Sequence, residues 1–259
     1  MESVGSRMDG TRRTGQLIIN ADDWGRDTQT TVRMLECLLH RSVSSVSAMV
    51  FMSDSERASE LARLHGVDAG LHLNCSLPFS SQECPSNLRE QQRKLVVYLT
   101  RHALARVMFH PGLTSTFEYV VKSQLAEFSR LYGKLPNRID GHHHMHLCAN
   151  ILFCGLLPEG ALVRRNFTFL PGEKNFVNRI YRQAMDKRLA RRHRTVDFLF
   201  PLAPLEPAAR LERICKLAQD HVVEVETHPI NASEYAFLMG DGVLRWTKST
   251  PIAPSFHVS

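Results

Sequence analysis

Acidic and histidine side chains gather at four separated places along the chain, each within or directly after an apolar run. These places are Asp22-Asp23, His72, the segment Asp140–His146 and His228. Carboxylates and imidazoles are the side chains that bind divalent metal ions and transfer protons near neutral pH. If the fold brings the four places together, they can form a hydrolytic metal centre.

The paired aspartates Asp22 and Asp23 follow a short apolar run. Two adjacent carboxylates repel each other unless a cation or a proton lies between them. Neighbouring residues of a strand point to opposite sides, so both carboxylates reach one site only if the strand turns at its end. The alternative interpretation is that one of the two caps the helix expected to begin near Thr28.

The histidine cluster contains four histidines in five positions, between His142 and His146. If the preceding strand continues, Asp140, His142 and His144 share one face. If a helix begins at once, His142 and His146 lie one turn apart. Both geometries retain His142, which is therefore the ligand candidate of the cluster. The other histidines then contact the ligands or the substrate, and the alternative for the whole cluster is a patch of surface histidines.

His72 lies between Leu71 and Leu73 on a run that is typical of a buried strand. The alternative to a metal ligand here is a hydrogen-bonded core histidine. One acid and two histidines around an open position form a common catalytic metal shell. Oxygen and imidazole ligands suit zinc and several other transition metals, and magnesium where water fills several positions. The ligand set alone does not choose among these metals, and we expect one divalent metal ion, Mg²⁺ or Zn²⁺, as the cofactor.

Short apolar runs alternate with longer amphipathic segments along the chain. Strands are expected at Gln16–Asn20, Val43–Phe51, Val67–Asn74, Asn137–Gly141, Ala161–Arg165, Thr195–Phe200 and Val222–Thr227. Helices are expected at Thr28–His40, Asp54–His65, Thr114–Tyr132, His146–Leu156, Asn175–Arg192 and Glu206–Gln219. This alternation predicts an α/β fold with a parallel sheet, either a (β/α) barrel or an open doubly wound sheet. In both, functional sites lie where the C-terminal strand ends meet.

The composition excludes a chain that is disordered over its whole length. The chain has 259 residues, of which 43% are hydrophobic and 22% charged, as in a globular protein with a core. We expect a disordered N-terminal tail over residues 1–14 and a single domain over residues 15–259. The sequence predicts no integral membrane segment and no glycine-rich phosphate loop. Six cysteines without a CxxC pair, and no signal peptide, favour a reduced cytoplasmic location.

The net charge of +6 is concentrated between Arg179 and Arg194, where seven Lys/Arg residues oppose only Asp186. Such a segment can bind nucleic acid, acidic lipid or an anionic substrate, and the alternative is a solvated helix face. Its only aromatic residue is Tyr181, so the base-stacking side chains of a nucleic-acid-binding protein are lacking. We therefore expect no nucleic-acid partner. The least regular segment, Leu77–Pro111, is a candidate lid or substrate loop.

Four motifs in fixed order resemble those of the YdjC-like carbohydrate deacetylases, the family of chitooligosaccharide deacetylase. They are Leu17–Gly25 (LIINADDWG), Gly70–Asn74 (GLHLN), Asp140–His146 (DGHHHMH) and Glu226–Pro229 (ETHP). Trp24 stands where the family usually has Phe, and His143 where it often has Gln. The resemblance implies an irregular seven-stranded (β/α) barrel like that of polysaccharide deacetylases.

The resemblance also implies an activity, that of a metal-dependent carbohydrate N-deacetylase, a hydrolase of linear amide bonds that removes N-acetyl groups from an amino-sugar-containing substrate. It assigns the metal to Asp23, His72 and His142, the general base to Asp22 and the general acid to His228. Side chains expected near the ligands or the substrate are His144, His146, Asn74, Asp140 and Arg165. The alternative is another metal-dependent hydrolase, an esterase or phosphoesterase acting on an anionic glycan or glycolipid. The sequence leaves open the sugar, its carrier and the oligomeric state, a homodimer included.

Overall fold

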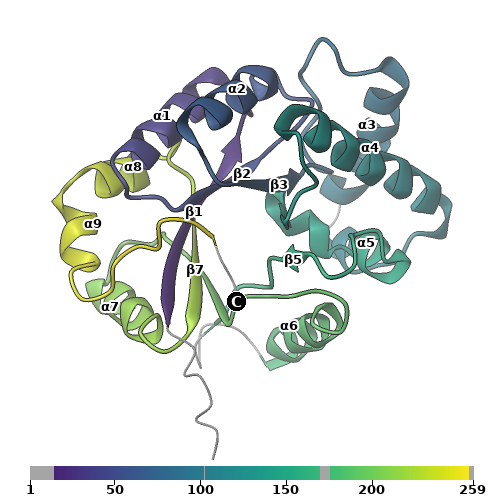
Figure 1. Ribbon diagram of the computed structural model, residues 1–259. Helices are drawn as coiled ribbons and strands as arrows, with labels where there is room; N and C mark the ends of the chain where they lie inside the picture. The colour runs from purple at the N-terminus through teal and green to yellow at the C-terminus, as the bar shows by residue number, and fades with distance from the viewer. Residues whose placement is uncertain (1–14, 102, 170–175, 257–259) are drawn as a thin grey trace, which may run out of the picture.

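The computed structural model describes residues 15–101, 103–169 and 176–256. Seven parallel strands form one sheet in the order β5-β4-β3-β2-β1-β7-β6, which curls into an open barrel with helices outside it (Figure 1). The strands are β1 (Gln16–Trp24), β2 (Ser45–Ala48), β3 (Ala69–Leu73), β4 (Arg138–Gly141), β5 (Leu162–Val163), β6 (Phe198–Pro201) and β7 (Val222–Thr227). The seven-stranded (β/α) barrel is thereby confirmed, while the tail over residues 1–14 lies outside the described residues.

The barrel is irregular where its two edge strands, β5 and β6, approach each other. Leu162 of β5 pairs with Arg194, ahead of β6, through an isolated bridge. Farther along, the Thr168 amide donates to the Leu199 carbonyl of β6 at 2.8 Å. Isolated contacts of this kind, in place of a continuous ladder, join the edges.

Six helices lie within the segments expected for them. They are α1 (Thr28–Leu39), α2 (Ser55–His65), α4 (Thr114–Tyr132), α5 (Ala149–Cys154), α6 (Phe176–Leu189) and α7 (Ala208–Leu217). The structure also contains α3 (Ser86–Arg101), α8 (Ala232–Met239), α9 (Asp241–Trp246) and the 3-10 turns η1 (Ala103–Arg106), η2 (Pro111–Leu113) and η3 (His142–Leu147). In the described part of the chain, no helix has both the length and the hydropathy that crossing a bilayer requires.

The expectation that Leu77–Pro111 is irregular is wrong, because α3 lies within it. The buried positions of α3 are Leu88, Gln92, Leu95 and Leu99, which follow helical spacing. Gln92 interrupts the apolar stripe and so hides the helical period in the sequence. In the structure, its Nε2 donates to the carbonyl oxygen of Leu77 at 2.7 Å.

The strands present apolar side chains to the surrounding helices and polar side chains to the inside of the barrel. Outward residues in the main core are Ile19, Ala21, Val46, Leu71, Ile139, Val163 and Val225. Inward residues that hydrogen-bond or pair across the barrel are Asn20, Asp22, Ser47, His72, Arg138, Asp140 and Glu224. Because side chains alternate along a strand, each strand supplies both faces. The interior therefore stays polar although it is buried.

The N-terminal end of the barrel is closed by a second apolar cluster. Its members are Ile18, Leu162, Val196, Val222, Ala253 and Phe256. The Arg138 guanidinium carbon lies 4.4 Å from the centroid of the Phe256 ring, directly above this cluster. Gly70 faces Arg138, and a Cβ there would lie 2.8 Å from Arg138 Nε, so the close approach requires glycine. The polar interior is thus sealed at one end and leads toward the C-terminal strand ends.

Candidate active site

The end of β1 brings both aspartates to the inside of the barrel. The pairing of β1 with β2 shifts register just after Asp22, which is a β-bulge. Asp23, at the bulge, has φ of 79°, a left-handed conformation that is uncommon outside glycine. This local turn lets two adjacent carboxylates point to the same side. Asp27, and neither of the pair, caps α1 by accepting the Thr30 amide hydrogen at 2.8 Å.

The histidine cluster after β4 follows neither of the two geometries expected from the sequence. His143 and His144 both have left-handed backbones, with φ of 54° and 57°, so the strand does not continue and no regular helix begins there. Two successive left-handed residues turn the chain, and the side chains on either side of the turn diverge. His142 Nδ1 lies 2.9 Å from Asp23 Oδ1, whereas His144 Nε2 lies 3.1 Å from Glu226 Oε2.

Asp23, His72 and His142 form a buried group, and one possible ligand atom from each lies within 4.8 Å of the others. His72 Nδ1 is 2.7 Å from Asp140 Oδ1, which fixes the ring so that Nε2 faces Asp23 Oδ1 at 3.4 Å. His72 Nε2 is buried and has no hydrogen-bond partner among the described residues. A metal-binding histidine usually hydrogen-bonds a carboxylate through one ring nitrogen and binds the metal through the other. The two ring nitrogens of His72 are placed in this way. The donor set therefore fits a divalent ion.

The charges around this group favour a cation. Burial opposes ionisation of Asp23, but the neighbouring imidazoles of His142 and His72 outweigh it and hold the pKa of Asp23 well below its usual range. Burial likewise disfavours a charge on His72, but Asp22 and Asp140 raise its pKa well above the usual value. The carboxylates thus stabilise positive charge at this point. A proton on His72 or a bound divalent ion can supply it.

Asp22 faces Arg164, a buried cation that the inward carboxylates share. The Arg164 guanidinium donates to both Asp22 oxygens, at 2.6 and 2.8 Å, in a bidentate pair. The same group lies 3.1 Å from Asp140, 3.1 Å from Glu226 and 2.7 Å from Glu224. One guanidinium charge does not neutralise four carboxylates. Burial disfavours the charged form of Glu224 and raises its pKa to about 7.

Asp22 belongs to two further groups of possible ligands, one with His72 and Asp140 and one with Glu226 and His228. In the first of them, Arg164 Nη2 already pairs with Asp140 at 3.1 Å. Arg164 Nη1 lies 2.6 Å from Asp22 and 3.1 Å from Glu226, so a positive charge already occupies the space between these carboxylates. A metal ion added there would be repelled by the guanidinium. The arrangement fits one ion rather than the paired ions of two-metal phosphoesterases.

The other side chains expected near the ligands or the substrate occupy different positions. His144 lines the open cavity together with His228, whose Nε2 lies 4.0 Å from Glu226 Oε1. His146 lies behind the site and donates from Nε2 to the Arg164 carbonyl oxygen at 2.9 Å. Asn74 holds the turn after β3, where its Oδ1 accepts from the amide of Leu77 at 2.9 Å.

Arg165 does not join these side chains. It is half-buried on the other side of the chain, where it pairs with Asp186 at 3.0 Å and donates to the Asp197 carbonyl oxygen. The preceding residue, Arg164, points into the barrel instead, because successive side chains of an extended segment alternate.

The site opens into a cavity of about 340 Å³ at the C-terminal strand ends. The cavity is lined by Asp22, Asp23, Arg26, His72, Gly141, His142, His143, His144, Phe167, Glu226, His228, Ile230 and Asn231. Arg26 donates to Asp23 Oδ2 at 2.7 Å, which leaves Oδ1 on the side of the imidazoles. Burial lowers the pKa of His143 to about 4, and the neighbouring charges of His142 and Arg106 add to this effect.

Four charged residues at or below the site have no role that was expected from the sequence, namely Arg26, Arg164, Glu224 and Glu226. For the two glutamates a signal exists, because they alternate with valines on β7 and so lie on one face of a buried strand. Two acids on such a face predict a buried cation. Arg26 carries no comparable signal, since only the bulge at Asp23 brings it to the site.

A sequence model of the family described as YdjC-like protein matches residues 16–248. The chain belongs to the YdjC-like family. Carbohydrate deacetylase from Mus musculus is 28% identical over 166 residues, which are 61% of this chain and 51% of that protein. Chitooligosaccharide deacetylase from Serratia marcescens is 33% identical over 132 residues, which are 51% of this chain and 50% of that protein. This YdjC-like chain thus spans about half the length of these curated relatives.

A solved structure supports the same fold. A protein from Enterococcus faecalis, assigned provisionally to cellobiose-phosphate cleavage, superposes with a TM-score of 0.64 at 19% identity. The superposition covers 93% of the YdjC-like chain and 96% of that protein. At this identity the likeness concerns the fold alone. The family resemblance drawn from the four sequence motifs is confirmed.

Proposed function

We propose that this YdjC-like protein is a metal-dependent carbohydrate deacetylase, which hydrolyses the N-acetyl group of an amino-sugar-containing substrate to acetate and a free amine. The observation that carries the proposal is the buried group of Asp23, His72 and His142, with His72 Nε2 unpartnered among the described residues. Asp22 lies beside it, oriented by Arg164. The names of the curated relatives support the substrate class.

In this proposal, Asp23, His72 and His142 hold one divalent ion, Mg²⁺ or Zn²⁺, which when bound polarises a carbonyl group and makes water more acidic. Asp22 accepts the proton of the attacking water, and the two hydrogen bonds from Arg164 keep its carboxylate in one orientation. As the C–N bond breaks, His228 donates a proton to the departing nitrogen, because an amine leaves only when protonated.

Glu226 supports the acid side of this mechanism. Burial opposes its ionisation, but the charges of His144 and Arg164 outweigh burial and lower the pKa of Glu226 to about 2. Glu226 therefore stays ionised at neutral pH, 3.1 Å from His144 and 4.0 Å from His228. The proposed acid thus lies beside a fixed negative charge.

Product analysis tests the activity directly. Protein stripped of metal and then supplied with Mg²⁺ or Zn²⁺ is expected to release acetate from N-acetylglucosamine oligomers, and to release none without the ion. Sugar phosphates serve as the comparison substrate. Phosphate release without acetate release would contradict the proposal and favour the phosphoesterase alternative.

Replacement of Asp140 by asparagine tests how His72 is held. Asparagine keeps the shape but loses the charge that fixes the His72 ring, so the affinity for the divalent ion is expected to fall by about 10–100-fold. Competition with a metal-binding dye measures this affinity. Asp220→Asn, at an exposed position, is the control and should change nothing. Unchanged affinity in Asp140→Asn would argue that His72 is not a ligand.

Replacement of His228 by alanine tests the general acid. Loss of a positioned acid is expected to slow amide hydrolysis by about 10²–10⁴-fold. Hydrolysis of an activated acetate ester should slow far less, because its leaving group departs without a proton. Rates on both substrates are compared with those of His65→Ala, an exposed control on α2. Equal losses on amide and ester would count against the assigned role.

A further inference from the structure

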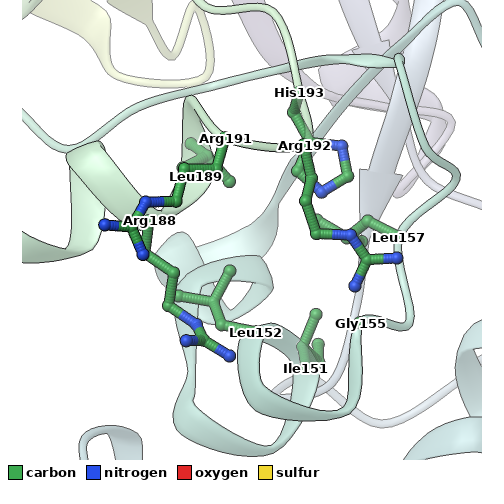
Figure 2. A pocket seen from close by; sticks show the side chains of 9 residues that line it. All are labelled: Ile151, Leu152, Gly155, Leu157, Arg188, Leu189, Arg191, Arg192 and His193. Carbon is green, nitrogen blue, oxygen red and sulfur yellow. The ribbon is translucent and has the colours of Figure 1, made fainter.

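A small pocket lies outside the active site, between α5 and the C-terminal end of α6 (Figure 2). Its volume is about 140 Å³. Ile151, Leu152 and Leu189 give it an apolar floor, and Arg188, Arg191 and Arg192 stand around it. No acidic residue lines it. Arg188, Arg191 and Arg192 belong to the basic segment Arg179–Arg194, for which neither the fold nor the active site supplies a role.

The guanidinium groups of this pocket have no carboxylate partner within the described ranges. Arg192 reaches across Gly155, where a Cβ would lie 2.2 Å from its Nη1. His193 Nδ1, on the same wall, is buried and has no hydrogen-bond partner in the described structure. Like charges gathered around one hollow repel each other unless an anion neutralises them. The pocket therefore has the chemistry of a phosphate-binding site.

An exposed apolar surface continues from this pocket. It consists of the segment 104–109 together with Phe153, and is termed the apolar patch. Leu104, Met108 and Phe153 are 65%, 58% and 51% exposed. The Phe109 ring lies 6.4 Å from that of Phe153, and Phe153 in turn supports the Arg188 guanidinium at 4.5 Å. Contiguous apolar exposure of this kind marks an interaction surface.

We propose that the pocket and the apolar patch together dock on the surface of an anionic lipid bilayer. The guanidinium groups bind head-group phosphates, and the apolar side chains insert at the boundary with the acyl chains. A second copy of the chain is a less suitable partner, because a twofold contact would bring the positive charges of the same arginines opposite one another. An anionic bilayer has the opposite charge. Phe109 and Phe153 pack edge to face against each other, Arg188 lies over the Phe153 ring, and Leu104 and Met108 have no ring faces on which bases stack, which disfavours nucleic acid.

One residue of the docking surface lies near the active-site cavity. Arg106, within the apolar patch, is near enough to His143 for its charge to act on that imidazole. His143 in turn lines the cavity. Docking does not require catalysis, so its test is independent of the proposed deacetylase activity.

Cosedimentation of the whole protein with lipid vesicles tests the charged part of the surface. Binding is expected with vesicles that contain phosphatidylglycerol, should be weak with phosphatidylcholine alone, and should fall as salt is added. The variant Arg188→Gln/Arg191→Gln/Arg192→Gln is expected to bind about a hundredfold more weakly, at about fivefold for each charge. The control Arg63→Gln/Arg213→Gln/Lys216→Gln removes as many charges from α2 and α7, and should bind like the wild type.

A second pair of variants tests the apolar part. Met108→Ser/Phe109→Ser is expected to weaken binding by at least about tenfold. Leu64→Ser/Leu135→Ser, which changes two exposed residues elsewhere, should have no effect. The proposal is overturned if phosphatidylglycerol vesicles do not bind, or if a control loses as much affinity as its matched variant. It is also overturned if inorganic phosphate or duplex DNA binds through these arginines while vesicles do not.

Discussion

Replacing Asp22 by asparagine is expected to lower kcat for deacetylation by about 10²–10⁴-fold, while the affinity for the divalent ion stays close to that of the wild type. Asparagine has the same shape and can still accept a hydrogen bond from Arg164 through its amide oxygen. It cannot accept the proton of the attacking water. Steady-state kinetics at saturating ion, combined with calorimetric titration of the ion, separate these two effects.

The neighbouring aspartate provides the matched comparison. Asp23→Asn should lose affinity for the ion together with activity, because Asp23 belongs to the metal group while Asp22 pairs with Arg164. Full activity of Asp22→Asn at saturating ion would refute the assignment of the base. If Asp22→Asn loses the ion and Asp23→Asn keeps it, the two roles are exchanged.

Replacing Arg164 by methionine is expected to lower the free energy of unfolding by about 3–5 kcal/mol. Arg164 is 3% exposed, and it is the cation shared by Asp22, Asp140 and Glu226. Without it, buried carboxylates face one another with their main counter-charge removed. Urea unfolding at neutral pH, followed by circular dichroism, measures the loss.

Arg165→Met is the control for this experiment, because it removes the same charge from the next residue. Arg165 is partly exposed and pairs with Asp186 near the surface, so its loss should cost about 1 kcal/mol or less. A similar loss in the two variants would show that the buried network does not depend on Arg164.

The fold follows from the sequence because its signal is repeated along the chain. Seven apolar runs alternating with amphipathic segments leave few arrangements other than a parallel barrel or open sheet. The errors have local causes. Gln92 occupies a buried position of α3, and its hydrogen bond to Leu77 is a tertiary contact that no periodicity reveals. The bulge at Asp23 extends β1 beyond its apolar run.

The site is harder to predict from the sequence, because a shift of one residue in a strand changes which side chains face it. The sequence places Asp23, His72 and His142 at strand ends, and the structure brings them together. The sequence does not show which of Arg164 and Arg165 points into the barrel, because apolar and polar residues do not alternate in the segment Leu162-Val163-Arg164-Arg165. The inward direction of Arg164 depends on the register of β5 against β4. The divergence of the histidines depends on two left-handed residues that local propensity does not favour.

Anomalous diffraction from crystals grown with Mn²⁺ or Zn²⁺ tests the proposed metal centre most directly. One peak is expected, in contact with Asp23, His72 and His142, and it should disappear in crystals of His72→Ala. A peak bound instead by Asp22, Glu226 and His228, or no peak beside His72 at saturating ion, would contradict the proposed centre.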